Sequence, residues 1–422
     1  MAATARGFRG RDGGFGARYE GVAVVGAKRT PFGDFMGAFA RVNPTDLGIV
    51  AARAALAQSG LSGRDVDQVI FANVAQSGPD AFYLPRHVGL YAGVPFSSPA
   101  LLVQRICGSG FEALVAGAEQ IALGKARVVL CGGTESMTRN PVASYGARSG
   151  LEMGRPDFVD TLTAELLDPS VNFSMGQTAE NLAKKYALTR GEVDAHALRS
   201  QERALAAQEA GRLAEEIVPV AAGALEAEGL QPRKVQLPRK VERVERDEHP
   251  RRTTPEQLAG LKPVFAKDGV QTAGNSSGIV DGAAAVVLCD EQTARERGLK
   301  VLGRLTGSAT AGVDPAIMGI GPAPAVRLLL EQYGLDLPAV DLVEVNEAFG
   351  AQFLSVAKEL GLDLNRTNVN GGAIALGHPL AATGSRLVST LLYELARRDG
   401  SRALASACIG GGQGTAVLLE RG

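Results

Sequence analysis

The 422-residue chain contains 53 glycines, 45% hydrophobic residues, and 44 basic against 45 acidic residues, which gives a formal net charge of −1. A net charge this close to zero excludes a general attraction to nucleic acid or acidic lipid, and no apolar run reaches the roughly 20 residues that a membrane helix needs. The length fits about two or three domain-sized units. These values predict a soluble globular protein whose partners must be inferred from local features.

The first 19 residues differ in character from the rest of the chain. They combine arginines with many glycines and contain no apolar stretch of the kind that a secretory signal needs. We predict that residues 1–19 form a flexible N-terminal extension, and that the protein is cytoplasmic, of bacterial type, rather than a protein of the mitochondrial matrix. The four cysteines are widely spaced and form no CxxC pair, which argues against a disulfide framework or zinc site and favours a reducing compartment.

An α/β pattern begins at residue 21. The apolar segment 21–26 predicts a buried strand, and the alanine-rich segment 44–59 predicts a helix. The segment that begins at Leu56 (Leu-Ala-Gln-Ser-Gly-Leu, with Val-Asp-Gln-Val from 66) matches the one that begins at Leu330 (Leu-Glu-Gln-Tyr-Gly-Leu, with Val-Asp-Leu-Val from 340) without a gap. This repeat of helix, turn and strand predicts two related halves.

Each half contains a later strand that ends at a cysteine followed by glycines. These strands are expected at 126–131 and 403–408. Ligands of open α/β sheets bind beyond the carboxyl ends of the strands, so a site is expected there. Between the halves, from about residue 140 to 275, the pattern loosens. We interpret that segment, with helices predicted at 176–186 and 192–210, as an insertion over the site.

Cys107 stands in the segment Gln-Arg-Ile-Cys-Gly-Ser-Gly, shortly before an apolar helical pattern at 111–121. A helix N-terminus or a neighbouring histidine lowers the pKa of a thiol from about 8.5, so we expect a thiolate nucleophile. An isolated cysteine is more often a buried structural residue. The flanking glycines, which let the backbone approach a ligand, and the histidine described next favour the catalytic interpretation.

His378 ends the segment Asn-Gly-Gly-Ala-Ile-Ala-Leu-Gly-His, ahead of a helix predicted at 381–396. A histidine there can take the proton of Cys107 and then donate a hydrogen bond to a carbonyl oxygen, although a helix-capping role is an alternative. Asn346, which follows the repeated strand of the second half, can hold a water beside this histidine because an amide both donates and accepts.

Cys408 is followed by Ile-Gly-Gly-Gly-Gln-Gly. Its thiol can move a proton at a carbon beside a carbonyl, and glycine N–H groups can stabilise an oxyanion, one donor contributing about 3 kcal/mol. Short glycine runs also form turns that bind no ligand. Taken together, Cys107, His378 and Cys408 predict thiol-based acyl transfer.

The other cysteines and histidines have plainer interpretations. Cys131 and Cys289 end apolar strands and are expected to be structural. The remaining histidines, which we expect to be surface or capping residues, are His87, His196 and His249.

Eight short motifs carry a family resemblance. They are Arg29-Thr-Pro-Phe, Arg105-Ile-Cys-Gly-Ser-Gly-Phe, Cys131-Gly-Gly-Thr-Glu-Ser-Met, Ser174-Met-Gly, Gly274-Asn-Ser-Ser-Gly, Asn346-Glu-Ala-Phe, Gly377-His-Pro and Cys408-Ile-Gly-Gly-Gly. In combination they resemble the thiolases, most closely the 3-ketoacyl-CoA thiolases of fatty-acid β-oxidation, from about Tyr19 to the end of the chain.

The resemblance implies a thiolase fold of two pseudo-symmetric α/β/α halves, five layers in all, with an inserted loop domain. It implies an N-terminal half at 20–139 plus 274–290 and a C-terminal half at 291–422. The loop domain, expected to bind coenzyme A and to make oligomer contacts, would span 140–273.

The resemblance also implies an acyltransferase that cleaves 3-ketoacyl-CoA with CoA into acetyl-CoA and a shortened acyl-CoA, reversibly by Claisen condensation. Cys107 would be the acylated nucleophile, His378 its base, and Cys408 the acid and base at the acetyl α-carbon. Asn346 would position a water in one oxyanion hole, and the N–H groups of Cys107 and Gly410 would form the other. Coenzyme A would be a substrate, with no bound cofactor and no metal.

For the pantetheine and acyl channel the resemblance points to Ser277, Met175, Met318 and Phe349, whose alternative is ordinary core packing. Arg251 and Arg252 would contact the adenosine end of CoA, with a solvated charge run as an equal alternative. The expected assembly is a homodimer or homotetramer, with no nucleic-acid or membrane partner.

One departure bears on the substrate. Acetoacetyl-CoA thiolases often carry histidine directly before Met-Gly in the loop domain, where this chain has Ser174, so we expect a broader range of 3-ketoacyl-CoA substrates. An acetoacetyl-CoA thiolase that condenses two acetyl-CoA is the alternative. A ketoacyl synthase would pair its cysteine with two histidines, or with histidine and asparagine, which Cys408 argues against. The intact reactive residues disfavour a non-catalytic acyl-CoA carrier.

Overall fold

A mixed sheet runs through both halves of the molecule. The computed structural model describes residues 3–11, 13–151, 153 and 157–422. In this part of the chain the sheet has twelve strands. They are β1 (Thr4–Arg9), β2 (Phe15–Glu20), β3 (Val22–Arg29), β4 (Gly33–Asp34), β5 (Gln68–Ala72), β6 (Ala100–Val103), β7 (Val128–Ser136), β16 (Val280–Asp290), β17 (Gly303–Gly312), β18 (Leu342–Val345), β19 (Arg402–Ile409) and β20 (Gln413–Arg421). The order across the sheet is β18-β19-β20-β17-β3-β16-β7-β5-β6, with β2 also paired to β17.

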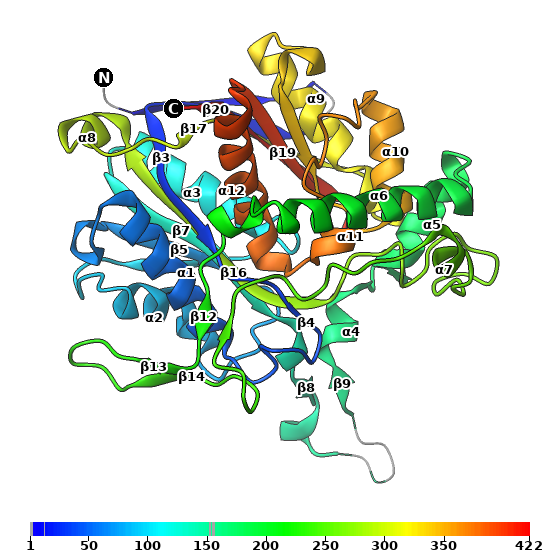
Figure 1. Ribbon diagram of the computed structural model, residues 1–422, viewed down its shortest axis with the longest axis horizontal. Coiled ribbons are helices and arrows are strands. Elements are labelled where there is room, and N and C mark those ends of the chain that lie inside the picture. Colours follow the sequence, from blue (N-terminus) through cyan, green and yellow to red (C-terminus); the bar gives the residue numbers. More distant parts are fainter. Residues whose placement is uncertain (1–2, 12, 152, 154–156) are drawn as a thin grey trace.

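Helices cover the sheet in layers. The helices of the two halves are α1 (Pro44–Ser59), α2 (Leu84–Tyr91), α3 (Ser109–Ala122), α8 (Glu291–Glu296), α9 (Pro322–Tyr333), α10 (Gly350–Leu360), α11 (Ala373–Leu376) and α12 (Leu380–Arg398). One core lies between α1, α2 and the first half of the sheet, a second encloses α3 and α12, and a third lies under α9 and α10. Figure 1 shows α12 at the centre of the molecule, with α1 and α2 on one side and α9 and α10 on the other. The five expected layers are therefore present.

Local sequence explains why these elements form where they do. In β3, Ala23 and Val25 pack in the core under α1, whereas Val22 and Val24 pack in the core around α3 and α12, the alternation that a strand buried on both faces requires. Helix α1 begins where the Asn43 side chain accepts a hydrogen bond from the next turn, and it has proline in its first turn. Its predicted bounds, 44–59, are confirmed.

The predicted repeat is a structural repeat. Gly60 ends α1 and Gly334 ends α9 with positive φ angles of 76° and 61°, which favour glycine. The strands that follow, β5 and β18, pair in parallel with β7, which carries Cys131, and with β19, which carries Cys408. Asp67 accepts backbone N–H bonds at the start of β7, and Asp341 accepts the equivalent bonds at the start of β19. The two halves therefore share the helix, the turn and the strand of the repeat, and also the aspartate that accepts these backbone hydrogen bonds.

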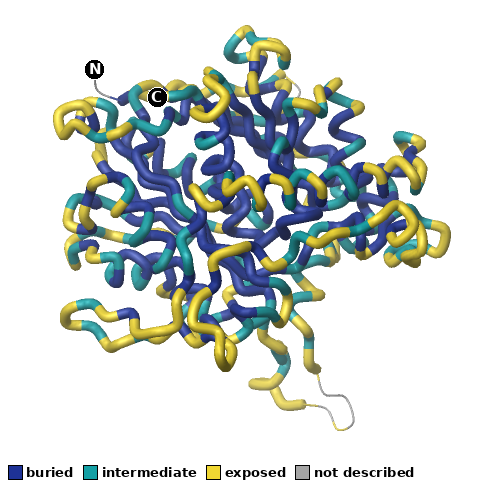
Figure 2. Tube along the Cα trace, viewed as in Figure 1, coloured by how far each residue is buried: buried dark blue, intermediate teal, exposed yellow. Residues whose placement is uncertain are grey.

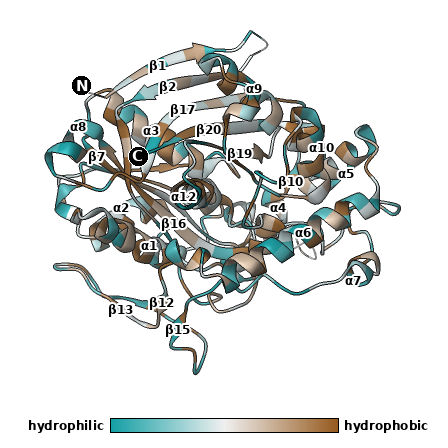
Figure 3. Ribbon diagram, turned by 45° about the horizontal axis from the view of Figure 1, so that its top comes forward, coloured by the Kyte–Doolittle hydropathy of each residue, from teal (hydrophilic) through white to brown (hydrophobic). Residues whose placement is uncertain are grey.

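The prediction of a flexible N-terminal extension is wrong for the described part of residues 1–19. β1 and β2 form an antiparallel hairpin, and β2 pairs with β17 (Figure 3). Gly13 and Gly14, both with positive φ, form its turn, and the Tyr19 hydroxyl lies 3.0 Å from that of Ser308 in a buried hydrogen bond. Because β17 offers unpaired backbone groups, even a glycine-rich segment can add a strand there. Residues 1, 2 and 12 lie outside the described residues.

The insertion folds over one end of the two halves. Its elements are β8 (Val142–Ala143), β9 (Val159–Asp160), α4 (Thr161–Glu165), β10 (Leu167–Asp168), β11 (Phe173–Ser174), α5 (Met175–Lys185), α6 (Arg190–Glu209), β12 (Val220–Ala221), β13 (Gly223–Leu225), β14 (Arg233–Val235), β15 (Arg243–Val244) and α7 (Pro255–Ala259). Figure 2 shows that its hairpins are largely exposed, whereas the sheet and central helices are buried. No described helix is long and apolar enough to cross a membrane.

A buried arginine anchors the insertion to the sheet. Arg29, at the end of β3, has no solvent exposure. Its Nε lies 2.6 Å from Glu216, and its two terminal nitrogens form a bidentate pair with Asp247 at 2.6 and 2.9 Å. Such a planar, bidentate pair fixes orientation as well as distance. The segment that follows Asp247 is thereby held against the N-terminal half, where it forms part of the pocket described below.

Candidate active site

A strained turn presents Cys107 ahead of α3. Ile106 has a φ of 43°, a left-handed conformation that is costly for a β-branched residue. The Ser109 hydroxyl holds the turn, because its oxygen accepts the Arg105 N–H at 2.8 Å and donates to the Ile106 carbonyl at 2.6 Å. Cys107 therefore lies directly before Gly108, the cap residue of α3, as the sequence predicts.

The burial of Cys107 opposes the predicted thiolate. The side chain is buried, and burial raises the pKa of the thiol to about 12. The backbone N–H groups of Gly410 and of Cys107 itself lower the pKa, while the nearby carboxyls of Glu165 and Glu135 raise it. Since the helix N-terminus does not outweigh burial, the thiol needs a base when it reacts.

His378 has the protonation state of such a base. Its Nδ1 lies 2.6 Å from the Thr383 hydroxyl, which donates its own proton to the Pro379 carbonyl at 3.1 Å. A hydroxyl that already donates must accept the second bond, so the ring proton is on Nδ1 and the Nε2 lone pair is available. Burial, and then the charge of Arg386, lower the pKa of His378 to about 3, so the ring is neutral at physiological pH.

Two helices from different halves bring Cys107 and His378 to the same place. α3 begins just after Cys107, α12 begins just after His378, and the helices cross at Gly110 and Gly384. A Cβ built on Gly110 would lie 2.8 Å from the Gly384 nitrogen, so the backbones are in contact and no side chain fits between them. Close packing at glycine therefore sets the relative position of the two N-terminal ends.

Cys408 ends β19 and lies close to Cys107. It is fully buried, and burial, together with the neighbouring Cys107, raises the pKa of its thiol. Gly410 follows, with its N–H near the Cys107 sulfur, and Gly411 and Gly412 turn the chain with φ angles of 79° and 83°. The arrangement places the two cysteines and a glycine N–H group together, as the sequence predicts, but with both thiols protonated.

Asn346 follows β18 with an unpartnered amide. Its backbone N–H donates to the carbonyl of Ser406 on β19 at 2.9 Å. The residue is buried, but neither the oxygen nor the nitrogen of its side-chain amide has a hydrogen-bond partner among the residues that the structure describes. Buried amides are normally paired, so an unpaired one indicates a place for water or ligand. The next residue, Glu347, accepts hydrogen bonds from Ser200, Asn368 and the Ile374 backbone, and so holds this turn to the loop that leads to His378.

Sequence reasoning missed this network. His196, expected at the surface or in a cap, is buried: its Nε2 lies 3.2 Å from Glu347, and its ring stacks on Phe353. A second missed group is Glu135, whose carboxylate accepts hydrogen bonds from Asn73, the Val74 and Ala75 N–H groups and the first turn of α12. Burial raises the pKa of Glu135 to about 8. The one feature of the sequence that could have indicated Glu135 is its position in the motif Cys131-Gly-Gly-Thr-Glu-Ser-Met.

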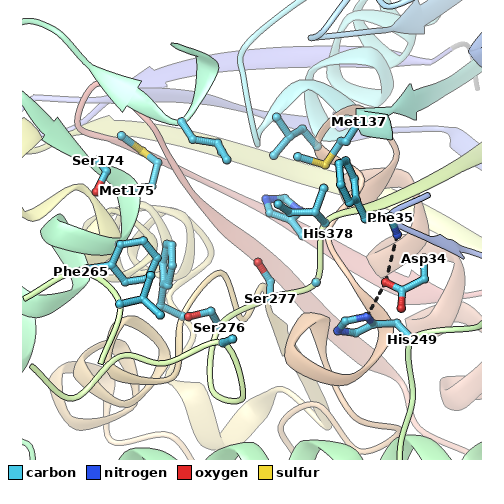
Figure 4. Close-up of a pocket in the computed structure, with 18 residues that line it drawn as sticks. Asp34, Phe35, Met137, Ser174, Met175, His249, Phe265, Ser276, Ser277 and His378 are labelled. Atoms are coloured by element: carbon cyan, nitrogen blue, oxygen red, sulfur yellow. Dashed lines mark hydrogen bonds and ion pairs between the residues drawn. The ribbon is translucent and has the colours of Figure 1, made fainter. Parts of the chain in front are cut away.

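A pocket of about 370 Å³ leads from the surface to His378. Its wall is mainly apolar and consists of Asp34, Phe35, Met137, Leu166, Ser174, Met175, Gly176, His249, Val264, Phe265, Ala273, Ser276, Ser277, Gly278, Ile279, Phe349, His378 and Leu380. Figure 4 shows Met175 and Phe265 on one side, Phe35 and Met137 on the other, and Ser277 near His378 between them. Both cysteines lie behind this wall, since Cys107 packs on Met137 and Leu380, and Cys408 packs on Met175.

The expected binding residues lie in three different places: on the pocket wall, behind it and at or beyond its rim. Ser277, Met175 and Phe349 line the pocket, whereas Met318 packs behind Met175 in the cluster that contains Cys408. Arg251 lies at the pocket rim, where its guanidinium is 3.1 Å from the ring of His249. Arg252 is largely exposed, and its partner is Glu209 on α6 at 3.3 Å.

His249 is a pocket residue rather than a surface or capping one. Its Nδ1 lies 2.9 Å from Asp34, and its ring packs against Gly278, where a Cβ would not fit. The carbonyl of Gly278 accepts the backbone N–H of His378 at 3.0 Å. Asp34 is 215 residues away along the chain, so no local pattern could have predicted this pair.

Comparison with known proteins identifies the fold family over nearly the whole chain. Residues 22–292 match the model of the thiolase N-terminal domain, and residues 299–421 match that of the thiolase C-terminal domain. The chain is 47% identical over 406 residues to the human mitochondrial 3-ketoacyl-CoA thiolase, covering 96% of this chain and 99% of that one. It is also 47% identical over 402 residues to an acetyl-CoA acetyltransferase of Pseudomonas aeruginosa, covering 95% and 99%.

A solved structure gives the same relationship in three dimensions. The crystal structure of the human mitochondrial 3-ketoacyl-CoA thiolase in complex with CoA matches with a TM-score of 0.89, covering 95% of this chain and 98% of that one at 47% identity. Relatives of equal identity carry two different substrate names, so sequence identity alone does not decide the substrate range.

Proposed function

Because the chain belongs to the thiolase family and is an acyltransferase, we propose that it cleaves 3-ketoacyl-CoA with CoA through an acyl group on Cys107. The observation that carries this proposal is the pairing of a buried thiol with a neutral histidine whose Nε2 has no partner among the described residues. Thiol and base are supplied by adjacent helix N-termini and meet at an apolar pocket.

In the first step the Nε2 of His378 takes the proton of Cys107 as the sulfur attacks the 3-keto carbon. The Cys107 and Gly410 N–H groups, which already lower the pKa of this thiol, are positioned to stabilise the negative charge that develops next to it. The bond between the α-carbon and the keto carbon then breaks. Its electron pair remains with acetyl-CoA as an enolate, and the shortened acyl group remains on the sulfur.

Cys408 completes the exchange in this proposal. Its thiol protonates the enolate carbon, and acetyl-CoA leaves. A second CoA then loses its thiol proton to Cys408 and attacks the acyl group on Cys107. A water held by Asn346, together with His378, would stabilise the enolate oxygen, which supplies a role for an amide that is otherwise unpaired in the described structure. Run in reverse, the same steps form a carbon–carbon bond.

Coenzyme A is proposed as a substrate, held by the pocket wall at Ser277, Met175 and Phe349, with Met318 supporting Met175 from behind. Arg251 at the rim is the better candidate for the adenosine end, because Arg252 already pairs with Glu209 in solvent. The described residues contain no group of three or more His, Cys, Asp or Glu side chains that could hold a metal ion.

Acetoacetyl-CoA metabolism is the second candidate. Ser174 favours the broader substrate range, because this small residue caps α5 at the pocket wall, where a histidine would occupy more space. The relatives named as acetyl-CoA acetyltransferases keep the alternative open. We retain the domain division at 140–273 and 291–422, and cytoplasmic location, as proposals.

A homodimer or homotetramer is also proposed. Strand β6 ends the sheet in the described structure, and Leu101 on it, with Phe82, Tyr83 and Phe96 nearby in sequence, exposes apolar surface. Exposed edge strands and large apolar groups are typical of subunit contacts. Light scattering tests this proposal, and a monomer at all concentrations would reject it.

The function is tested by CoA-dependent cleavage of acetoacetyl-CoA and 3-ketooctanoyl-CoA with wild type and Cys107→Ala. We expect the wild type to cleave both and the variant neither. Cleavage of acetoacetyl-CoA alone would move the role to acetoacetyl-CoA metabolism. Full cleavage by the variant, or none by the wild type, would refute the proposal.

A further inference from the structure

Helix α4 packs against the side-chain clusters of both cysteines of the site. Leu162 on α4 packs in the cluster that contains Cys107, and Leu166, its C-cap residue, packs in the cluster that contains Cys408. Residues three and four apart on a helix share a face, so Glu165 lies on the face that these leucines turn towards the cysteines. A carboxyl is therefore placed beside the apolar side chains that α4 packs against the site.

The position of α4 is fixed at both ends. The Thr161 N–H donates to the Pro141 carbonyl at 3.1 Å, next to the β8–β9 pair. The Leu166 carbonyl accepts the N–H of Met175, the first residue of α5, at 2.9 Å. Because Met175 itself lines the pocket, α4 moves only if the pocket wall moves with it.

The Glu165 carboxyl is poorly satisfied. Its Oε1 is buried and has no hydrogen-bond partner in the described part of the chain, and neither amide atom of the nearby Asn140 has one. Burial raises the pKa of Glu165 to about 7; the Asn140 amide, which lies nearby without forming a full hydrogen bond, lowers it, and the charge of Asp160 raises it. The Glu165 charge in turn raises the pKa of Cys107 and of Glu135. These mutual effects place the carboxyl close to the nucleophile.

Building on the proposed function, we propose that Glu165 is a specificity-determining residue that disfavours long alkyl chains on Cys107 relative to an acetyl group. An acyl group on Cys107 extends among the apolar side chains around the sulfur, to which α4 contributes Leu162. An acetyl group ends before the carboxyl and leaves space for water beside it. The methylenes of a longer chain displace that water and leave the carboxyl without a partner, which is unfavourable, and more so when it is ionised.

The first test compares kcat/KM for 3-ketooctanoyl-CoA, which leaves a hexanoyl group on the cysteine, with kcat/KM for acetoacetyl-CoA. Glu165→Leu should raise the ratio of the two about tenfold, the range expected when a hydrophobic pocket is extended. The matched control is Glu202→Leu, the same substitution at an exposed position of α6, which should leave the ratio unchanged. An unchanged ratio in folded Glu165→Leu would overturn the proposal.

A second test does not depend on Glu165→Leu being folded. From pH 6 to pH 8 the carboxyl ionises, so the wild-type ratio should fall about tenfold, while the ratio for Glu165→Gln should stay constant. Using a ratio cancels ionisations that affect both substrates equally, including those of Cys107, Glu135 and Asp160, the titratable groups that face Glu165. Equal pH profiles for the two proteins would overturn the proposal. Absence of all cleavage by the wild type would instead refute the thiolase function.

Discussion

Thr383 controls which nitrogen of His378 carries the proton, and Thr383→Val tests this directly. The substitution keeps the shape of the side chain and removes the hydroxyl, which lies 2.6 Å from Nδ1. Without an acceptor, the buried Nδ1–H is left without a hydrogen bond, which costs about 1–3 kcal/mol. The tautomer with its proton on Nε2 avoids this cost and becomes favoured. In that tautomer Nε2 cannot take the proton of Cys107.

If this shift in tautomer raises the activation free energy by about 1.4 to 2.8 kcal/mol, kcat falls 10- to 100-fold. We expect little change in the KM for CoA, since the Thr383 hydroxyl faces the ring and the helix backbone rather than the pocket wall. The assay is thiolysis of acetoacetyl-CoA, in which Thr383→Ser should restore most of the rate.

The matched control for this substitution lies on the same helix. The Thr390 hydroxyl is also buried and donates to Glu216 at 2.8 Å, so Thr390→Val removes a hydrogen bond of similar length away from the pocket. We expect Thr390→Val to lower the melting temperature without a comparable loss of kcat. A Thr383→Val enzyme within twofold of wild type, or an equal loss in Thr390→Val, would refute the assignment of the tautomer.

Two further predictions concern the helix contact and the protonation of the site. Gly384→Ala places a methyl group against the α3 backbone, 2.7 Å from the Gly110 carbonyl carbon, so we expect about 1–3 kcal/mol lower stability and at least tenfold lower kcat, measured by thermal melting and thiolysis. Gly191→Ala, at an uncrowded position of α6, is the control and should keep the wild-type stability and kcat. The folded-state pKa of His378, about 3, lies below its ordinary value of 6.5, so the unfolded chain binds this proton first and wild-type stability falls as the pH drops below about 6.5. Urea unfolding at pH 7 and pH 5 should show a smaller fall for His378→Asn, and equal falls would contradict the shifted pKa.

The parts of the fold that follow from local sequence could be predicted. The helix at 44–59 has its cap, Asn43, and its terminating glycine, Gly60, directly beside the segment, and the second copy of the repeat has the equivalent glycine, Gly334. The N-terminal hairpin could not be recognised in the same way, because its residues have weak strand preference and depend on pairing with β17. The glycines at 13 and 14 were the one local signal of its turn.

The proposed reactive residues stand out in the sequence for a different reason. Cys107, His378 and Cys408 are rare residue types in glycine-rich segments, so each is conspicuous by itself. The groups that orient them are ordinary residues brought together by the fold, as with Thr383 and Glu135. The ionisation of Cys107 was mispredicted because a helix terminus is visible in sequence, whereas the burial that opposes it is a property of the whole structure.

The contact between α3 and α12 has a consequence for redesign. Cys107 and His378, the proposed nucleophile and base, come from different halves, and their spacing depends on backbone touching backbone at Gly110 and Gly384, with no side chain that could adapt. The spacing of these two side chains is therefore separable from the pocket wall, to which the insertion contributes Leu166, Met175 and Phe265. Substrate preference can accordingly be altered by exchanging that insertion between relatives, provided that the two glycines and the helices that bear them are left untouched.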